Sequence, residues 1–177
     1  MVAGHRHATV FEVGPASAPE SVAIRALLER NGLPTNDLES ARPEFAVIRE
    51  QGQVIAAGAL QHFGPAALLR SVVVSSDRRG IGLGQAIVCE LERRARAAQI
   101  RRLVLLTQSA AEFFARQGYR IIERSTAPEN MQASEEFRSL CPSSATCMAK
   151  NLQPAPSAAD QGQATGSGST RVPRKRP

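Results

Sequence analysis

The stretch "DRRGIGLGQAI", residues Asp77 to Ile87, places three glycines and two arginines shortly after the apolar run "LLRSVVV", with two serines between them. A helical pattern follows, so the glycines are predicted to lie in a short loop between a strand and a helix. Glycine leaves the backbone uncovered, and the amide N–H groups of a first helical turn have no intrahelical acceptor. Because the helix dipole and the two arginines add positive potential, the stretch predicts a binding site for a pyrophosphate group.

Two familiar phosphate-binding motifs do not fit these glycines. The dinucleotide fingerprint G-x-G-x-x-G requires its third glycine at a position where this chain has Gln85 or Ile87. The P-loop requires Gly-Lys-Ser/Thr, and the stretch contains no lysine. The sequence therefore favours neither a Rossmann cofactor site nor a P-loop nucleotide site.

The rest of the chain alternates between strand-like and helix-like patterns. Strands are expected at residues 9–13, 44–50, 53–60, 67–74, 101–107, 119–125 and 145–152, and helices at 20–32, 83–98, 109–118 and 128–140. The order β-α-β-β-β-α-β-α-β-(α)-β predicts an α/β fold with a mixed sheet, antiparallel in its first part and covered by helices. The helix after the glycines is expected to bury Leu83, Ile87, Cys89, Leu91, Ala95 and Ala98.

Length and composition predict one globular domain with tails. The chain has 177 residues, of which 42% are hydrophobic and 21% are charged. We expect the domain at residues 9–152, after a short N-terminal tail at 1–8. Residues 153–177 are rich in Pro, Gly and Ser, end in basic residues, and carry too few large apolar side chains to offset the entropy of ordering. This second tail is predicted to be disordered.

Charge and cysteine content narrow the cellular setting and the partners. Half of the net charge of +6 lies in the C-terminal tail, and the chain has no Trp and one Tyr, so a base-stacking nucleic-acid surface is not predicted. No apolar stretch approaches the roughly 18 residues of a membrane span, and the start lacks a signal-peptide pattern. Three cysteines do not make a disulfide framework. We expect a cytoplasmic protein that binds a small molecule, not nucleic acid or a membrane, and homodimer formation is left open.

The segment Arg79-Gly80-Ile81-Gly82-Leu83-Gly84 resembles the R/Q-x-x-G-x-G/A motif of the GNAT family of acetyl-CoA-dependent N-acetyltransferases. The resemblance continues through "SVVVSSD" before the loop and through "LVLLT" and "AEFFARQGY" after the helix, and it covers residues 9–152. It implies a GNAT-like acyl-CoA N-acyltransferase fold, acetyl-CoA as the co-substrate and no metal. The plain alternative is a glycine-rich turn that binds no ligand.

The resemblance also implies where acetyl-CoA lies. In this family two neighbouring strands separate, and the pantetheine arm lies beside the first of them, which here is the strand at 67–74. The amide of Val73 is expected to face the thioester oxygen as it becomes an oxyanion. Thr107 replaces an asparagine that often touches the cofactor in this family. The residues expected to bind the cofactor are Val72, Val73, Val74, Arg79, Gly80, Ile81, Gly82, Leu83, Gly84, Gln85 and Thr107.

The usual acid and base of the family are missing from this chain. Phe114 takes the position of a tyrosine that many members use as the acid. No acidic residue occurs between Gln51 and Ser76, where some members carry a carboxylate base. The candidates for proton transfer are Ser71, His62 and Glu123, with His62 expected in a hairpin loop, where a surface histidine without a catalytic role is the ordinary alternative. No base is assigned.

The C-terminal half is similar to domains of the N-acetylglutamate synthase kind and, more closely, to the ArsN-type N-acetyltransferases of arsenic-resistance operons. The segments shared with the ArsN-type enzymes are "LLRSV" at 68–72 and "LCPSSATCM" at 140–148. This resemblance implies the α-amine of an acidic amino acid, or of a glutamate mimic such as arsinothricin or phosphinothricin, as the acceptor. The residues expected to bind it are Arg70, Ser71, Arg138 and Ser144.

Three alternatives stay open at this point. Arg70 fits an acceptor carboxylate, but it equally fits a structural ion pair with a buried carboxylate of the protein. Cys141 and Cys147 are either a pair that binds an arsenical or two ordinary buried thiols. The whole protein is either an enzyme for small amines, a protein or peptide N-acetyltransferase, or an inactive acetyl-CoA-binding sensor.

Overall fold

The computed structural model describes residues 11–152, which form a seven-stranded mixed sheet in the order β1-β2-β3-β4-β5-β7-β6. The α/β class with a mixed sheet is therefore confirmed. The predicted tails at 1–8 and 153–177 lie outside the described residues. The strands are β1 (Glu12–Pro15), β2 (Glu44–Glu50), β3 (Gln53–Phe63), β4 (Ala66–Val74), β5 (Arg102–Thr107), β6 (Arg120–Ile121) and β7 (Thr146–Asn151).

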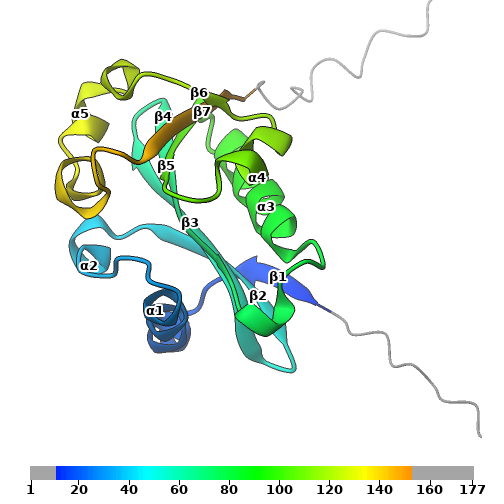
Figure 1. The fold of residues 1–177 in the computed structure, drawn as a ribbon. Coiled ribbons are helices and arrows are strands. Elements are labelled where there is room, and N and C mark those ends of the chain that lie inside the picture. The colour runs from blue at the N-terminus through cyan, green and yellow to red at the C-terminus, as the bar shows by residue number, and fades with distance from the viewer. Residues whose placement is uncertain (1–10, 153–177) are drawn as a thin grey trace, which may run out of the picture.

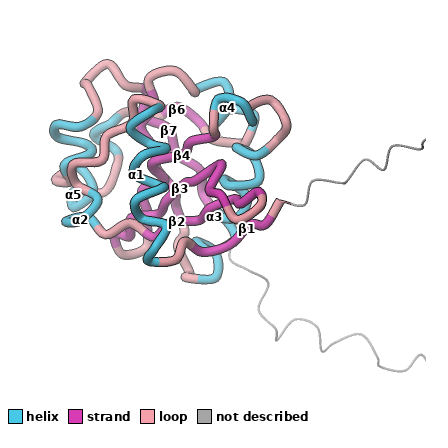
Figure 2. Tube along the Cα trace, turned by 90° about the horizontal axis from the view of Figure 1, so that it is seen from below, coloured by secondary structure: helices cyan, strands magenta, loops and turns pink. Residues whose placement is uncertain are grey.

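Helices cover both faces of this sheet. Helices α3 and α4 lie on one face, and α1, α2 and α5 lie on the other, as Figure 1 shows; Figure 2 is viewed from the side of α1. None of the helices described in residues 11–152 is long and apolar enough to cross a membrane. The α-helices are α1 (Ser21–Arg30), α2 (Leu38–Ala41), α3 (Leu83–Ala97), α4 (Ala111–Arg116) and α5 (Glu129–Gln132). Short 3-10 turns lie at η1 (Ala18–Glu20), η2 (Ser76–Arg78) and η3 (Arg124–Thr126), and η4 (Glu136–Leu140) is a π-helix.

The face under α3 holds the largest part of the core. The predicted stripe of α3 is buried, except that Ala98 follows the last helical residue and is exposed. Cys89 is also exposed, so its predicted place in the core is wrong: it lies on the outer side of the helix. Helix α3 approaches β3 closely because Gly58 has no side chain, and a Cβ there would lie 2.5 Å from Ile87. This contact fixes the helix that follows the glycine loop against the centre of the sheet.

The opposite face is divided between two smaller clusters. Helix α1 buries Leu27 and Leu28 against Val73 of β4, and the segment after β6 buries Met131 and Phe137 against Leu68. Neighbouring residues of β4 face opposite sides of the sheet, as the period of a strand requires: Ala67 and Leu69 belong to the core under α3, whereas Leu68 belongs to this face.

The C-terminal segment departs most from the prediction. The expected strand at 119–125 is reduced to β6, because the backbone turns into η3, where the N–H and hydroxyl of Thr126 donate to the Glu123 carbonyl. The expected helix at 128–140 is divided into α5 and η4. The Arg124 guanidinium donates to the carbonyls of Phe137, Cys141 and Pro142, which holds this region as a wide turn. The short helix α2 was not predicted.

Candidate active site

Strands β4 and β5 separate in the middle of the sheet. Their parallel pairing covers Ala66 to Leu68 of β4, whereas β4 continues to Val74 and β5 to Thr107. Strand β3 stays paired with β4 up to Val74, and β7 stays paired with β5 up to Thr107. The sheet therefore opens between β4 and β5, and the two strands present backbone groups to the opening. This is the separation that the sequence resemblance implied.

A β-bulge lies in β4 at the edge of this opening. Ala57 pairs with Val73 and Ala59 with Arg70, so β4 has one residue more than β3 over this interval. Ser71 absorbs the bulge with a φ of 57°, in the left-handed region. Ser71, predicted both as an acceptor residue and as a candidate for proton transfer, thus lies at the opening and is half-buried.

The glycine loop lies at one end of the opening and begins helix α3. Gly80 and Gly82 have φ values of 81° and 89°, which glycine adopts without strain, and Gly82 is the N-cap. A hollow of about 330 Å³ lies over this helix start. Its walls include Val74, Gly82, Gly84, Gln85, Phe113 and Arg116. Of the residues predicted to hold the pyrophosphate, Gly82 to Gln85 line this hollow, which reaches the end of β4, whereas Ile81 is exposed and does not line it.

The two arginines of the loop have partners within the protein. The Arg78 Nε donates to Glu50 at 2.8 Å, and the Arg79 Nε donates to the Val74 carbonyl at 3.2 Å. A further nitrogen of Arg79 donates to Asn31. These bonds fasten the loop to β2 and to the end of α1. The positive charge stays near the hollow, while the backbone amides of the first helical turn are the groups left for an anion.

The aromatic residues of α4 and its C-terminal end belong to the core. Phe114 is buried and makes edge-to-face contacts with Phe113 and Tyr119, at centroid distances of 5.0 and 5.6 Å. Burial, together with the charge of Glu92, raises the pKa of Tyr119 far above its ordinary value. Tyr119 therefore does not replace the missing acid. Thr107 accepts a hydrogen bond from the Ala110 amide at 3.0 Å and caps the turn before α4.

Arg70 is the most heavily engaged side chain on the opposite face. Its Nη1 and Nη2 donate to the two oxygens of Asp37, at 2.5 and 2.6 Å, and Nη1 also donates to Gln61. The Nη2 also lies 2.8 Å from Glu136. Burial lowers the pKa of Arg70, but the hydrogen bonds with Asp37 and the charge of Glu136 outweigh it and raise the pKa above its ordinary value. The structure thus contains the ion pair that the sequence left open.

Asp37 and Glu136 are the residues that sequence reasoning missed. Asp37 directly precedes α2, and Glu136 opens η4. Both resemble surface acids in their sequence contexts, "NDLES" and "SEEF". The only signal was indirect, since an arginine inside an apolar strand requires an anionic partner.

The other predicted acceptor and catalytic residues lie apart from this group. His62 is part of β3, not of a hairpin loop as predicted, because the hairpin continues to Phe63 and turns at Gly64. It pairs with Ala67, where β4 and β5 are still joined, and its Nε2 lies 3.5 Å from Glu44. The exposed residues Glu123, Arg138 and Ser144 follow β6, and within residues 11–152 no side-chain hydrogen bond or ion pair joins them to Arg70.

The thiols of Cys141 and Cys147 are protonated at neutral pH. Burial and the nearby Glu136 raise the pKa of Cys141 to about 12, and its Sγ donates to Glu136 at 3.2 Å. Burial also raises the pKa of Cys147. Within the described part of the chain, no three His, Cys, Asp or Glu side chains gather as a metal site. Nothing in this geometry favours the arsenical-binding alternative, which requires thiolates.

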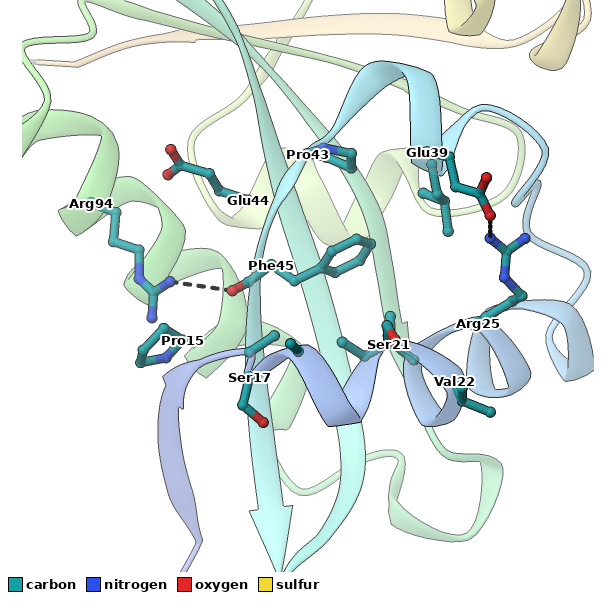
Figure 3. Close-up of a pocket in the computed structure, with 14 residues that line it drawn as sticks. Pro15, Ser17, Ser21, Val22, Arg25, Glu39, Pro43, Glu44, Phe45 and Arg94 are labelled. Atoms are coloured by element: carbon teal, nitrogen blue, oxygen red, sulfur yellow. Dashed lines mark hydrogen bonds and ion pairs between the residues drawn. The ribbon is translucent and has the colours of Figure 1, made fainter.

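A second hollow, of about 730 Å³, lies at the edge of the sheet between η1, α1, α2 and the start of β2 (Figure 3). Phe45 lies at its centre in this view. Arg94 donates to the Phe45 carbonyl at 3.3 Å on one side, and Arg25 pairs with Glu39 at 3.3 Å on the other. None of the predicted cofactor or acceptor residues lines this hollow, so the predicted site lies elsewhere, at the opening between β4 and β5.

A mixed sheet whose two central parallel strands separate beside a glycine-rich helix start has the GNAT-like fold that the sequence predicted. Residues 41–121 match the family of acetyltransferase (GNAT) domains. The matched segment, which runs from the end of α2 to β6, is therefore similar to GNAT acetyltransferase domains, and this similarity supports the expectation of an acyltransferase.

Solved structures of acetyltransferases share the fold. N-acetylglutamate synthase from Neisseria gonorrhoeae, complexed with coenzyme A and N-acetyl-glutamate, is 21% identical with a TM-score of 0.71 over 81% of this chain, which spans about a third (35%) of that protein. The protein Rv2747 from Mycobacterium tuberculosis, in complex with CoA and NLQ, is 28% identical with a TM-score of 0.70 over 80% of this chain and 99% of its own. A ribosomal-protein-alanine N-acetyltransferase from Escherichia coli is 16% identical, with a TM-score of 0.64 over 84% and 98%.

Proposed function

We propose that the protein transfers the acetyl group of acetyl-CoA to the α-amine of an acidic amino acid or of a glutamate mimic of the arsinothricin or phosphinothricin type. The observation that carries the proposal is the opening between β4 and β5, which ends at the amide-rich start of α3. The coenzyme A complexes of the similar synthase and of Rv2747 support the choice of co-substrate.

The backbone supplies what the thioester needs. The pyrophosphate binds at the amides of Leu83 to Gln85, where negative charge is favoured by the helix dipole. The pantetheine arm lies along the free edge of β4. The bulge at Ser71 turns backbone groups into the opening, and the amide of Val73 stabilises the oxyanion that forms when the amine attacks. Positioning and this contact supply much of the acceleration, and the thiolate is a tolerable leaving group.

Two observations support an amino acid as the acceptor: the similarity to the synthase and the positive charge of Arg70. The similar synthase was solved with N-acetyl-glutamate. Arg70 lies two residues beyond the last β4–β5 pair and carries the only cationic side chain of β4. Within residues 11–152 its Nε has no hydrogen-bond partner, so one donor is left for a carboxylate. The likeness of segments 68–72 and 140–148 to the ArsN-type enzymes extends the proposal to glutamate mimics and to a role in arsenic resistance.

Thioester consumption tests this proposal directly. The purified protein is mixed with acetyl-CoA and with L-glutamate, phosphinothricin or arsinothricin in turn, and the free thiol of coenzyme A is measured. We expect turnover with at least one of the three. Acetyl-CoA binding without turnover on any amine would favour the inactive sensor, a candidate motivated by Phe114 at the position of the usual acid. Turnover of peptide N-termini alone would favour a protein acetyltransferase. The ribosomal-protein-alanine N-acetyltransferase from Escherichia coli, which has a similar fold, is an enzyme of that kind.

A further inference from the structure

The buried charges around Arg70 do not balance. Arg70 contributes one positive charge, and Asp37 and Glu136 contribute one negative charge each. The side chains of Arg70 and Asp37 are 1% and 2% exposed, and that of Glu136 is 9% exposed. Among the described residues no other cationic side chain pairs with either carboxylate: the nearby Arg124 donates to backbone carbonyls instead. A buried surplus of one carboxylate is costly unless a cation or a proton neutralises it.

Two atoms of this cluster also lack hydrogen-bond partners. They are the Nε of Arg70, a donor, and the Oε2 of Glu136, an acceptor. The Oε2 is 2.8 Å from the Arg70 Nη2, which is an ion-pair distance, but the pair is not aligned as a hydrogen bond. A free donor and a free acceptor therefore lie side by side in a buried place. An α-amino acid offers the complement, a carboxylate next to an ammonium group.

The cluster is placed where the acceptor must arrive. Arg70 follows Leu68, the last residue of β4 that pairs with β5, and its side chain is on the side of the sheet away from α3. Acetyl-CoA that starts at α3 and passes between the strands delivers its acetyl group toward this face. The segments that carry Asp37 and Glu136 meet at Arg70 on this face, since both carboxylates pair with its guanidinium.

On these grounds, and resting on the proposed function, we propose that Glu136 binds the ammonium group of the acceptor and takes a proton from it. Asp37 is less suited to this role because both of its oxygens already accept hydrogen bonds from Arg70. Glu136 receives only the weak thiol bond from Cys141 at 3.2 Å and the unaligned contact with Arg70. Its position is fixed because Arg124 binds the carbonyl of Phe137, the next residue.

The ammonium group gives one proton to the Glu136 carboxylate and becomes an amine with a free electron pair. Its nitrogen forms a bond to the thioester carbon, the carbon–sulfur bond breaks, and that electron pair leaves with the sulfur. The nitrogen then loses its surplus proton to the thiolate, and Glu136 returns its own proton to water. The products are the N-acetyl amino acid and free coenzyme A.

The test compares Glu136→Gln with Glu135→Gln, which makes the same change at an exposed neighbouring residue. Acceptors are L-glutamate and the other standard amino acids with acetyl-CoA. We expect Glu136→Gln to lower kcat/KM for the best acceptor by about 100-fold or more, with acetyl-CoA affinity unchanged. Because the substitution removes a surplus buried charge, the unfolding temperature of the free protein stays the same or rises. Glu135→Gln leaves all three quantities unchanged.

The results distinguish an error in the role of Glu136 from an error in the proposed function. If the wild-type protein acetylates no amino acid, the proposed function itself is wrong. If the wild-type protein is active and Glu136→Gln stays within about threefold of it, or if the variant loses stability, Glu136 is not the amine-binding base. A second measurement needs no variant and uses the 2-hydroxy analogue of the best acceptor, which lacks the ammonium group. This analogue is expected to bind the wild-type protein at least about tenfold more weakly than the acceptor itself. Equal binding of the two would overturn the inference.

Discussion

Two buried charge clusters lie on opposite faces of the sheet, and they differ in how completely they are satisfied. Under α3, the Lys150 Nζ donates three hydrogen bonds, two to Glu92 and one to the Gln117 carbonyl, and Arg96 also pairs with Glu92. On the other face, Arg70 is shared by Asp37 and Glu136 and leaves two atoms without partners. In the first cluster both Glu92 oxygens and the Lys150 Nζ have partners, although the hydroxyl of the neighbouring Tyr119 has none among the described residues. The second cluster has a donor, an acceptor and a surplus negative charge without partners.

The difference separates a structural role from a functional one. A saturated cluster joins helices to strands, and here it joins α3, the end of α4 and β7. An unsatisfied cluster in a protein interior calls for an explanation, and a ligand of matching charge is the simplest. Both clusters contribute to stability, but only the second is expected to affect the acceptor.

The largest effect is expected from Arg70→Met, which leaves two buried carboxylates without a cation. Removing one partner of a buried ion pair costs roughly 3–5 kcal/mol of the free energy of unfolding. Urea unfolding measures this loss. The triple variant Arg70→Met, Asp37→Leu, Glu136→Gln removes the stranded charges and is expected to recover most of the stability. A loss below about 1 kcal/mol for the single variant would show that the cluster is already hydrated and would remove the contrast between the faces.

A large effect on ligand binding is expected from Gly82→Asp at the start of α3. The side chain would enter the amide-rich hollow, and its charge would repel a pyrophosphate, so acetyl-CoA affinity should fall about 100-fold or more, or roughly 2.7 kcal/mol. Gly52→Asp is the matched control: its φ of 78° is equally left-handed, and it too has open space around it, but it lies in the β2–β3 turn. Calorimetry should show normal binding for the control. Equal loss in both variants would point to backbone strain alone.

The cofactor site at the start of α3 and the acceptor site around Arg70 also differ in how far the sequence predicts them. The predicted cofactor residues, apart from Thr107, lie within residues 72–85, so one contiguous stretch indicates the strand, the loop and the helix start. The acceptor side brings together Asp37, Arg70 and Glu136 from three distant segments. Only Arg70 was apparent, because a charged residue interrupts an apolar strand. Which carboxylates approach it depends on how α2 and η4 pack, and no local pattern encodes that packing.

The same distinction explains the errors in the predicted elements. Strands β2, β3, β4 and β5 and helices α1 and α3 were found because their hydrophobic periods are long and regular. The segment after β6 was mispredicted because Arg124 organises its carbonyls through side-chain bonds that leave no periodic trace. Cys89 was mispredicted as buried because it lies between two buried positions of α3, Val88 and Leu91, but on the outer side.

A moderate effect is expected from Lys150→Met in the saturated cluster. The change leaves Glu92 buried with Arg96 alone, which should cost about 2 kcal/mol of the free energy of unfolding, less than at Arg70 because the Lys150 side chain is 23% exposed. Acetyl-CoA affinity and kcat/KM should stay within about twofold of the wild-type values. This is the reverse of the pattern expected for Glu136→Gln. Loss of activity in the Lys150 variant without loss of stability would place function on both faces.

The smallest effect is expected from Glu20→Gln, at a partly exposed pair that serves as a reference for both clusters. Hydrogen bonds from Arg49 lower the pKa of Glu20 from its ordinary 4.5 to about 2. The stabilisation is therefore complete above pH 4.5 and is lost as the pH falls through 2. Urea unfolding at pH 7 should show that the variant is less stable by about 1 kcal/mol, a small value because solvent screens the pair. This difference should shrink toward zero in acid, where Glu20 is protonated in the wild-type protein as well. The control is Glu39→Gln, at a carboxylate whose side chain is 92% exposed, and it should show almost no loss of unfolding free energy at any pH. A loss equal to that of Glu20→Gln would mean that burial does not set the strength of the ion pairs in this protein.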